Sequence, residues 1–269
     1  MLERLNCLSP YGIEKIRGIS PIGSAERLNR HFDNIEKIIF LVKESKSKFD
    51  EIANCLAHFK NIRGIIKKCQ NGNGLNEIDL FEIKGFLLIL EKFIPLFDEL
   101  PIFAGIGFVS MIDALNILDP QNQRIAPFSV SNEFSAALKE IRREKTLIEN
   151  MPKDDNFTAK RAEIVALEQA EEERVMRQLS EKLRKYCEDF YHNTDNIGEL
   201  DLTIAKALQA MEYGAIRPEI GGNSLLLQDM YNPYVAEILA KVNKKFTEIS
   251  LKLENGATVI TGANMGGKS

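Results

Sequence analysis

Apolar residues recur every three or four positions along the first 118 residues, which is the spacing of an amphipathic helix. After Ser24 they fall on one helical face, namely Leu28, Phe32, Ile35, Ile38, Ile39 and Val42. Cap and turn residues divide this part of the chain: Ser9-Pro10 opens a short helix, and Asn71-Gly72-Asn73-Gly74 marks a turn. The predicted helices cover residues 10–17, 24–42, 48–69, 76–100 and 108–118. The pattern predicts an all-α array.

The middle of the chain carries more charge, yet its apolar residues keep the helical spacing. One predicted helix carries the apolar residues Phe134, Leu138, Ile141 and Ile148. It also carries a basic stripe of Lys139, Arg142, Arg143 and Lys145. The polar stretch 150–156 interrupts it, and a second charged helix runs from Thr158 to about Tyr191. About thirty residues make a rod of ~50 Å, so the two helices predict a long antiparallel α-hairpin. Its basic stripe fits either a solvated face, balanced by Glu171, Glu172 and Glu173, or an arm that transmits motion.

Beyond the hairpin the pattern changes from helical to strand-like. A helix over 197–211, ended by Gly214, leads into the change. The strand-like stretches are 217–220, 224–229, 247–253 and 257–260, with a short helix over 233–242. Asn255-Gly256 between two of them is a hairpin signal. We therefore predict a mainly α fold with three parts, namely a helical core domain over 1–130, a hairpin of long helices over 131–193 and a small β-rich unit over 194–269.

Composition limits the class of protein. The 269 residues are 44% hydrophobic and 28% charged, as in a soluble globular protein, and no apolar run reaches the ~20 residues that span a bilayer. The amino terminus shows no apolar signal core, and the four cysteines are scattered, so we expect a cytoplasmic protein with reduced thiols and no membrane contact. A net charge of −4 does not fit an autonomous nucleic-acid-binding domain. Any DNA contact must be local, oligomeric or made by parts outside this chain.

The last nine residues carry the clearest chemistry. They read Thr261-Gly262-Ala263-Asn264-Met265-Gly266-Gly267-Lys268-Ser269 and contain the pattern G-x-x-x-x-G-K-[ST]. Glycines let successive backbone N–H groups converge on the β-phosphate. Lys268 reaches the β- and γ-phosphate oxygens, and the Ser269 hydroxyl takes a Mg²⁺ position. Since the apolar stretch 257–260 supplies the preceding strand, the sequence predicts a nucleotide-binding P-loop.

The residues between the fixed positions of this P-loop motif resemble those of the MutS family of DNA mismatch-repair ATPases, whose P-loop typically reads TGPNMGGKS. Three further stretches are similar to the family: Ser9-Pro10-Tyr11-Gly12, residues 138–145, and Glu199-Leu200-Asp201 followed by Arg217-Pro218-Glu219-Ile220. Ala263 replaces the loop proline, and Tyr231-Asn232-Pro233 stands where the family has an Arg-His-Pro-like step. The N-terminal mismatch-reading domain has no counterpart, and the clamp at the lever tip is reduced to roughly 149–158.

The resemblance implies a homodimeric ABC-type ATPase that binds DNA and uses ATP with Mg²⁺. Its long helices would be levers moved by nucleotide binding and hydrolysis. The resemblance assigns nucleotide binding to Gly262, Ala263, Asn264, Met265, Gly266, Gly267, Lys268 and Ser269, with Ser269 also ligating Mg²⁺. Phe246 lies where family members place an apolar group against adenine, although strand packing explains it equally simply.

The resemblance also limits what these 269 residues should do. In the family, the Mg²⁺-coordinating Asp-Glu strand and the signature loop follow the P-loop, so we expect no catalytic residue, weak nucleotide binding and no ATP hydrolysis here. The alternative is a non-catalytic helical interaction module with a vestigial P-loop. Both mismatched and branched DNA remain possible partners of the complete protein.

Overall fold

The computed structural model describes residues 4–150, 155–222 and 224–259. Contacts divide the chain into two compact units. We call Met1–Pro21 with Arg30–Gln209 the helical unit, and Ile22–Asn29 with Ala210–Ser269 the terminal unit. The predicted mainly α fold with a small β-containing part is confirmed. None of the helices in the described ranges is long and apolar enough to cross a membrane.

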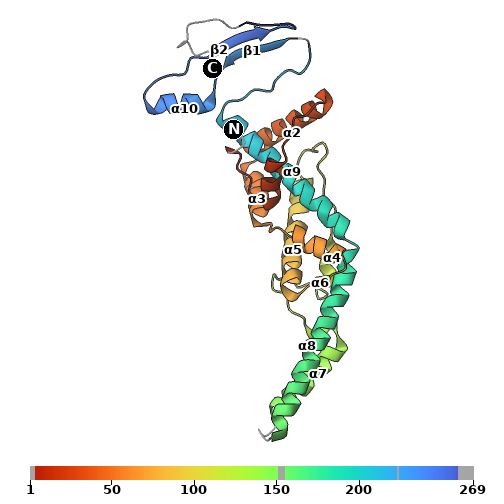
Figure 1. Ribbon diagram of the computed structural model, residues 1–269. Coiled ribbons are helices and arrows are strands. Elements are labelled where there is room, and N and C mark those ends of the chain that lie inside the picture. The colour runs from red at the N-terminus through yellow and green to blue at the C-terminus, as the bar shows by residue number, and fades with distance from the viewer. Residues whose placement is uncertain (1–3, 151–154, 223, 260–269) are drawn as a thin grey trace. The chain divides into compact units, whose positions relative to one another are not determined.

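The helices follow one another along most of the chain (Figure 1). They are α1 (Pro10–Arg17), α2 (Ala25–Glu44), α3 (Lys46–His58), α4 (Arg63–Gln70), α5 (Glu77–Asp98), α6 (Ile112–Leu118), the 3-10 turn η2 (Asn132–Phe134), α7 (Ala136–Glu149), α8 (Asp155–Arg184) and α9 (Cys187–Glu212). Local sequence explains where several begin. Ser9 caps α1 by accepting a hydrogen bond from the Gly12 amide. Asn76 and Asp79 form a capping box at the start of α5.

Aromatic side chains fill the core of the helical unit around α5. Phe86 and Phe93 of α5 are buried and pack against Phe59, with ring centroids 5.1 and 5.7 Å away. Phe190 of α9 contacts Phe86 at 6.0 Å. The partners of α5 thus come from an early and a late part of the chain. α5 is therefore the central element of this core, as the broad apolar face of its sequence indicates.

The predicted helix over 48–69 is wrong in one respect, because it is two helices. α3 ends before Phe59, whose backbone is extended, and α4 begins at Arg63. The Tyr11 hydroxyl supplies hydrogen bonds to the backbone at the break. It donates to the Lys60 carbonyl at 2.8 Å and accepts from the Ile62 amide at 3.2 Å. Gly64, the residue that weakens the pattern, lies inside α4.

A second correction concerns the end of the long hairpin helix. The predicted break near residues 192–196 does not occur, and the helix breaks instead between Arg184 and Cys187. The polar side chains near 193 are buried rather than solvated, because Asn193 exchanges two 2.9 Å hydrogen bonds with the backbone of Val109. The same bonds hold residues near 109 out of a helix, so α6 starts at Ile112 and not at 108.

The terminal unit contains a two-stranded antiparallel sheet. β1 (Leu225–Met230) pairs with β2 (Ile249–Leu253), and α10 (Pro233–Lys241) lies between them in sequence. The pairing shifts between Leu227 and Met230, where Asp229 has a positive φ of 49° and its amide donates to Ser250 Oγ at 2.9 Å. The predicted strand over 257–260 is not found in its described part, 257–259. Asn255-Gly256 forms a bend rather than a hairpin, because β2 takes β1 as its partner across α10.

Candidate functional site

The predicted phosphate-binding residues lie outside the described part of the chain. They are Gly262, Ala263, Asn264, Met265, Gly266, Gly267, Lys268 and Ser269. Their roles therefore stay predictions from the sequence, as does the Mg²⁺ position at Ser269. Of the predicted site residues, Phe246 lies within the described ranges.

Phe246 is half-buried and has an aromatic partner. Its ring lies edge-on to Tyr231, with centroids 6.5 Å apart, and the Tyr231 hydroxyl donates to the Tyr213 carbonyl at 2.6 Å. Next along the chain, Asn232 caps α10 by accepting from the amides of Tyr234 and Val235. The step that departs from the family pattern, Tyr231-Asn232-Pro233, thus supplies a ring for Phe246 and the start of a helix.

In the helical unit, two of the family-like stretches meet face to face. Asp201 of α9 is fully buried and accepts from the Leu8 amide at 3.0 Å, the Ser9 amide at 2.7 Å and the Ser9 hydroxyl at 2.6 Å. Burial raises the pKa of Asp201, and the bonds from Ser9 and Leu8 oppose that shift. Residues noted separately in the sequence, Ser9 and Asp201, thereby fix α1 on α9.

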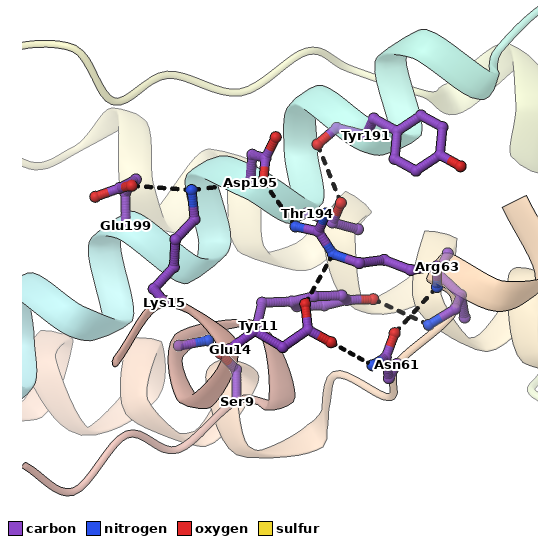
Figure 2. Close-up of polar contacts among 12 residues, drawn as sticks. Ser9, Tyr11, Glu14, Lys15, Asn61, Arg63, Tyr191, Thr194, Asp195 and Glu199 are labelled. Atoms are coloured by element: carbon purple, nitrogen blue, oxygen red, sulfur yellow. Dashed lines mark hydrogen bonds and ion pairs between the residues drawn. The ribbon is translucent and has the colours of Figure 1, made fainter. Parts of the chain in front are cut away.

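A charged layer extends the contact between α1 and α9 (Figure 2). Arg63, at the first position of α4, donates to Asp195 of α9 at 2.7 Å and lies 3.2 Å from Glu14 of α1. Lys15 of α1 pairs with Glu199 of α9 at 2.9 Å. Burial alone would raise the pKa of Asp195, but the Arg63 hydrogen bond and the Lys15 charge outweigh it and lower that pKa. We call α1, the start of α4 and residues 195–201 of α9 the α9 junction.

The charged layer of the α9 junction has no signature in the sequence. Its members come from α1, α4 and α9, and each reads alone as an ordinary surface charge. The stretches around Ser9 and Asp201 resemble the family in sequence, but nothing in the sequence indicates that they contact each other.

The helices α7 and α8 lie side by side as a hairpin (Figure 1), and ion pairs join them. Arg142 of α7 donates to Glu168 at 2.8 Å and to Glu172 at 2.6 Å, both on α8. Lys145 also pairs with Glu168, and the Ser135 hydroxyl, which caps α7, donates to Glu171. Part of the basic stripe therefore binds the partner helix instead of facing solvent.

No protein-family model matches this chain. Several known proteins are similar to it in sequence. The chain is 35% identical over 111 residues to a protein named Endonuclease MutS2 from Leuconostoc citreum (strain KM20), covering 41% of this chain and 13% of the relative. A protein of the same name from Caldanaerobacter subterraneus subsp. tengcongensis aligns over 333 residues at 23% identity, covering 98% of this chain and 40% of the relative. One from Pediococcus pentosaceus is 33% identical over 100 residues, covering 37% of this chain and 12% of the relative.

These matches show which proteins the chain is similar to. A mainly helical fold with a long helical hairpin, followed by a small sheet and a P-loop sequence, fits the MutS resemblance, and the relatives just described carry the MutS name. The chain is MutS-like, with Endonuclease MutS2 proteins as its relatives. It spans less than half of the length of each relative described here.

Proposed function

We propose that this chain acts as a MutS-like DNA repair or recombination protein that binds ATP with Mg²⁺ through its last nine residues. The observation that carries the proposal is a P-loop motif whose variable residues resemble those of the MutS family. It lies in a chain of which 98% aligns with an Endonuclease MutS2. A short motif and a similarity along nearly the whole chain both point to the same family.

Each P-loop residue has a proposed role. Gly262, Asn264, Gly266 and Gly267 shape the backbone cradle for the phosphates, with Ala263 and Met265 between them. Lys268 neutralises charge on the γ-phosphate, and Ser269 ligates Mg²⁺. Phe246 supports the adenine from the same unit, with Tyr231 packed behind it.

The helical unit supplies the proposed mechanical part. The α9 junction fixes α9 to α1 and α4, and ion pairs fix α7 to α8. Since α9 ends at Glu212, three residues after the last residue of the helical unit, it is the element through which nucleotide binding would act on the levers. DNA, and a second copy of the protein, are the proposed partners.

Nucleotide binding tests the proposal directly. We expect a fluorescent ATP analogue with Mg²⁺ to gain anisotropy on titration with the chain, and Lys268→Ala to weaken binding at least about tenfold because a charge-assisted contact is lost. Lys252→Ala is the matched control, because this exposed lysine of β2 pairs with Glu254. Equal binding by wild type and Lys268→Ala, or none by either, would contradict the proposal and favour a helical interaction module.

A further inference from the structure

A small polar pocket lies in the helical unit between the turn after α4 and one face of α8. Its volume is about 140 Å³, and it is lined by Cys69, Gly72, Asn73, Gly74, Arg177, Ser180, Glu181 and Arg184. That volume is below the ~300 Å³ at which pockets for whole small molecules begin. The pocket therefore suits a single chemical group rather than a complete nucleotide.

Ser180 fixes this face of α8 against the turn. Its hydroxyl accepts from the Leu75 amide at 2.9 Å, and its carbonyl accepts from the Cys69 thiol at 3.4 Å. Ser180 is itself buried. The walls of the pocket are therefore held at a defined distance by bonds that do not involve the charged residues around it.

Two arginines lie across the turn, one on each side of Ser180. Arg177 and Arg184 are seven residues apart on α8, which places them on the same helical face. A Cβ at Gly72 would lie 3.4 Å from Nη1 of Arg184, and a Cβ at Gly74 would lie 3.6 Å from Cγ of Arg177. Gly72 also has a positive φ of 78°, which disfavours side chains. The two glycines thus let both arginines lie against the turn.

Within the described ranges, neither guanidinium has a hydrogen bond or an ion pair in the protein. The nearby Lys68 pairs with Asp79 on α5, so that carboxylate is already engaged. Glu181 also lines the pocket and has no ion pair among the described residues. The pocket therefore holds two cations and one anion.

We propose that this pocket binds a phosphate group between Arg177 and Arg184. Guanidinium groups present several N–H donors in a planar fork that matches the geometry of phosphate oxygens. The phosphate comes either from a nucleic-acid backbone or from free phosphate. The backbone source rests on the proposed function, because a chain of net charge −4 needs a local basic site to contact DNA. The phosphate pocket itself does not rest on it.

The competing interpretation is that Glu181 neutralises both arginines in solution. It lies four residues after Arg177 and three before Arg184, which are the spacings of helical ion pairs. The two interpretations differ in what they predict for phosphate binding by Glu181→Gln. Removing the anion strengthens phosphate binding if the pocket is a phosphate site, and only releases two solvated arginines if it is not.

The experiment uses the full 269-residue chain carrying Lys268→Ala, so that the predicted P-loop does not contribute. Inorganic phosphate is titrated to about 20 mM, which detects a site with a Kd near 1 mM, and the Gly72 and Gly74 amides and the arginine Nε groups are followed by NMR. We expect saturable shifts that disappear in Arg177→Gln/Arg184→Gln and occur at lower phosphate in Glu181→Gln. The charge-matched control is Arg161→Gln/Lys182→Gln, two exposed residues of α8 that do not line the pocket.

A labelled DNA duplex then separates the two sources of phosphate. If the pocket takes a backbone phosphate, the double arginine variant weakens duplex binding about tenfold more than its control does and lowers the salt slope by about one. Phosphate shifts without that difference assign the pocket to free phosphate. A chain that binds no duplex but shows the shifts counts against the DNA proposal alone. If no saturable shift occurs, or Glu181→Gln has no effect, the pocket proposal is wrong.

Discussion

Two glycines allow α1 and α9 to approach each other closely. A Cβ at Gly12 would lie 2.2 Å from Oδ2 of Asp201, and a Cβ at Gly198 would lie 2.9 Å from the Tyr11 carbonyl oxygen. In the helix interior, Gly→Ala normally stabilises by about 1 kcal/mol. In these two places the methyl group has no room, so helix propensity and packing act in opposite directions.

We therefore expect opposite signs from the same chemical change at different glycines. Gly12→Ala and Gly198→Ala should lower the free energy of unfolding by about 1–3 kcal/mol, the usual cost of overpacking. Gly85→Ala, inside α5 with nothing within 4 Å of its Cβ position, should raise it by up to ~1 kcal/mol. Urea unfolding followed by circular dichroism measures all three. If Gly12→Ala and Gly198→Ala raise the free energy of unfolding as Gly85→Ala does, the close contact at the α9 junction is not formed.

At the scale of the elements, the α7–α8 hairpin depends on carboxylates that are charged in the folded state. Hydrogen bonds from Arg174 and Ser135 lower the pKa of Glu171 to about 2. A lowered carboxyl pKa contributes stability at pH values above its unfolded pKa, and this contribution is lost as pH falls toward the folded pKa. Hairpin stability should accordingly decline between about pH 4.5 and pH 2.

Amide hydrogen exchange of α7 and α8 across this pH range tests the prediction. Wild type should lose protection in the hairpin as pH falls, after correction for the intrinsic exchange rate. Glu171→Gln should start with less protection at neutral pH and show a smaller pH dependence. Glu173→Gln, an exposed glutamate on the same helix, is the control and should behave like wild type. Identical pH profiles for Glu171→Gln and wild type would contradict the proposed role of this carboxylate.

Most helices could be predicted from the sequence, because each one carries its own apolar face and several carry their own caps, such as Ser9 and Asn76. The breaks could not. The gap between α3 and α4 is satisfied by the hydroxyl of Tyr11, about fifty residues earlier in the chain. The local composition around Asn193 is typical of a loop. In the structure, however, Asn193 makes a buried contact with the backbone of Val109.

The candidate sites differ in the same way. The P-loop is a contiguous string, so its chemistry follows from sequence alone. The pocket between Gly72 and Arg184 joins a turn to a helix more than a hundred residues later, and the sequence indicated only a turn there. Local motifs identify sites built from neighbouring residues, whereas sites built by packing need the fold.

For the whole molecule, the question is how much of the ATPase reaction these 269 residues support. The P-loop motif supplies a phosphate cradle, one lysine and one hydroxyl ligand for Mg²⁺. Phosphoryl transfer also needs a group that orients the attacking water and further ligands that hold the metal. The family resemblance assigns those groups to a segment that follows the P-loop.

We therefore expect the purified 269-residue polypeptide to bind ATP with Mg²⁺ without turning it over. Release of radiolabelled phosphate from γ-labelled ATP should match that of the Lys268→Ala variant, which serves as the background for contaminating activity. Binding measured on the same sample separates a chain that binds without hydrolysis from one that does not bind. Phosphate release that exceeds the background and is abolished by Lys268→Ala would mean that the 269 residues contain a complete catalytic site. In that case the water-orienting group must come from the two units described above.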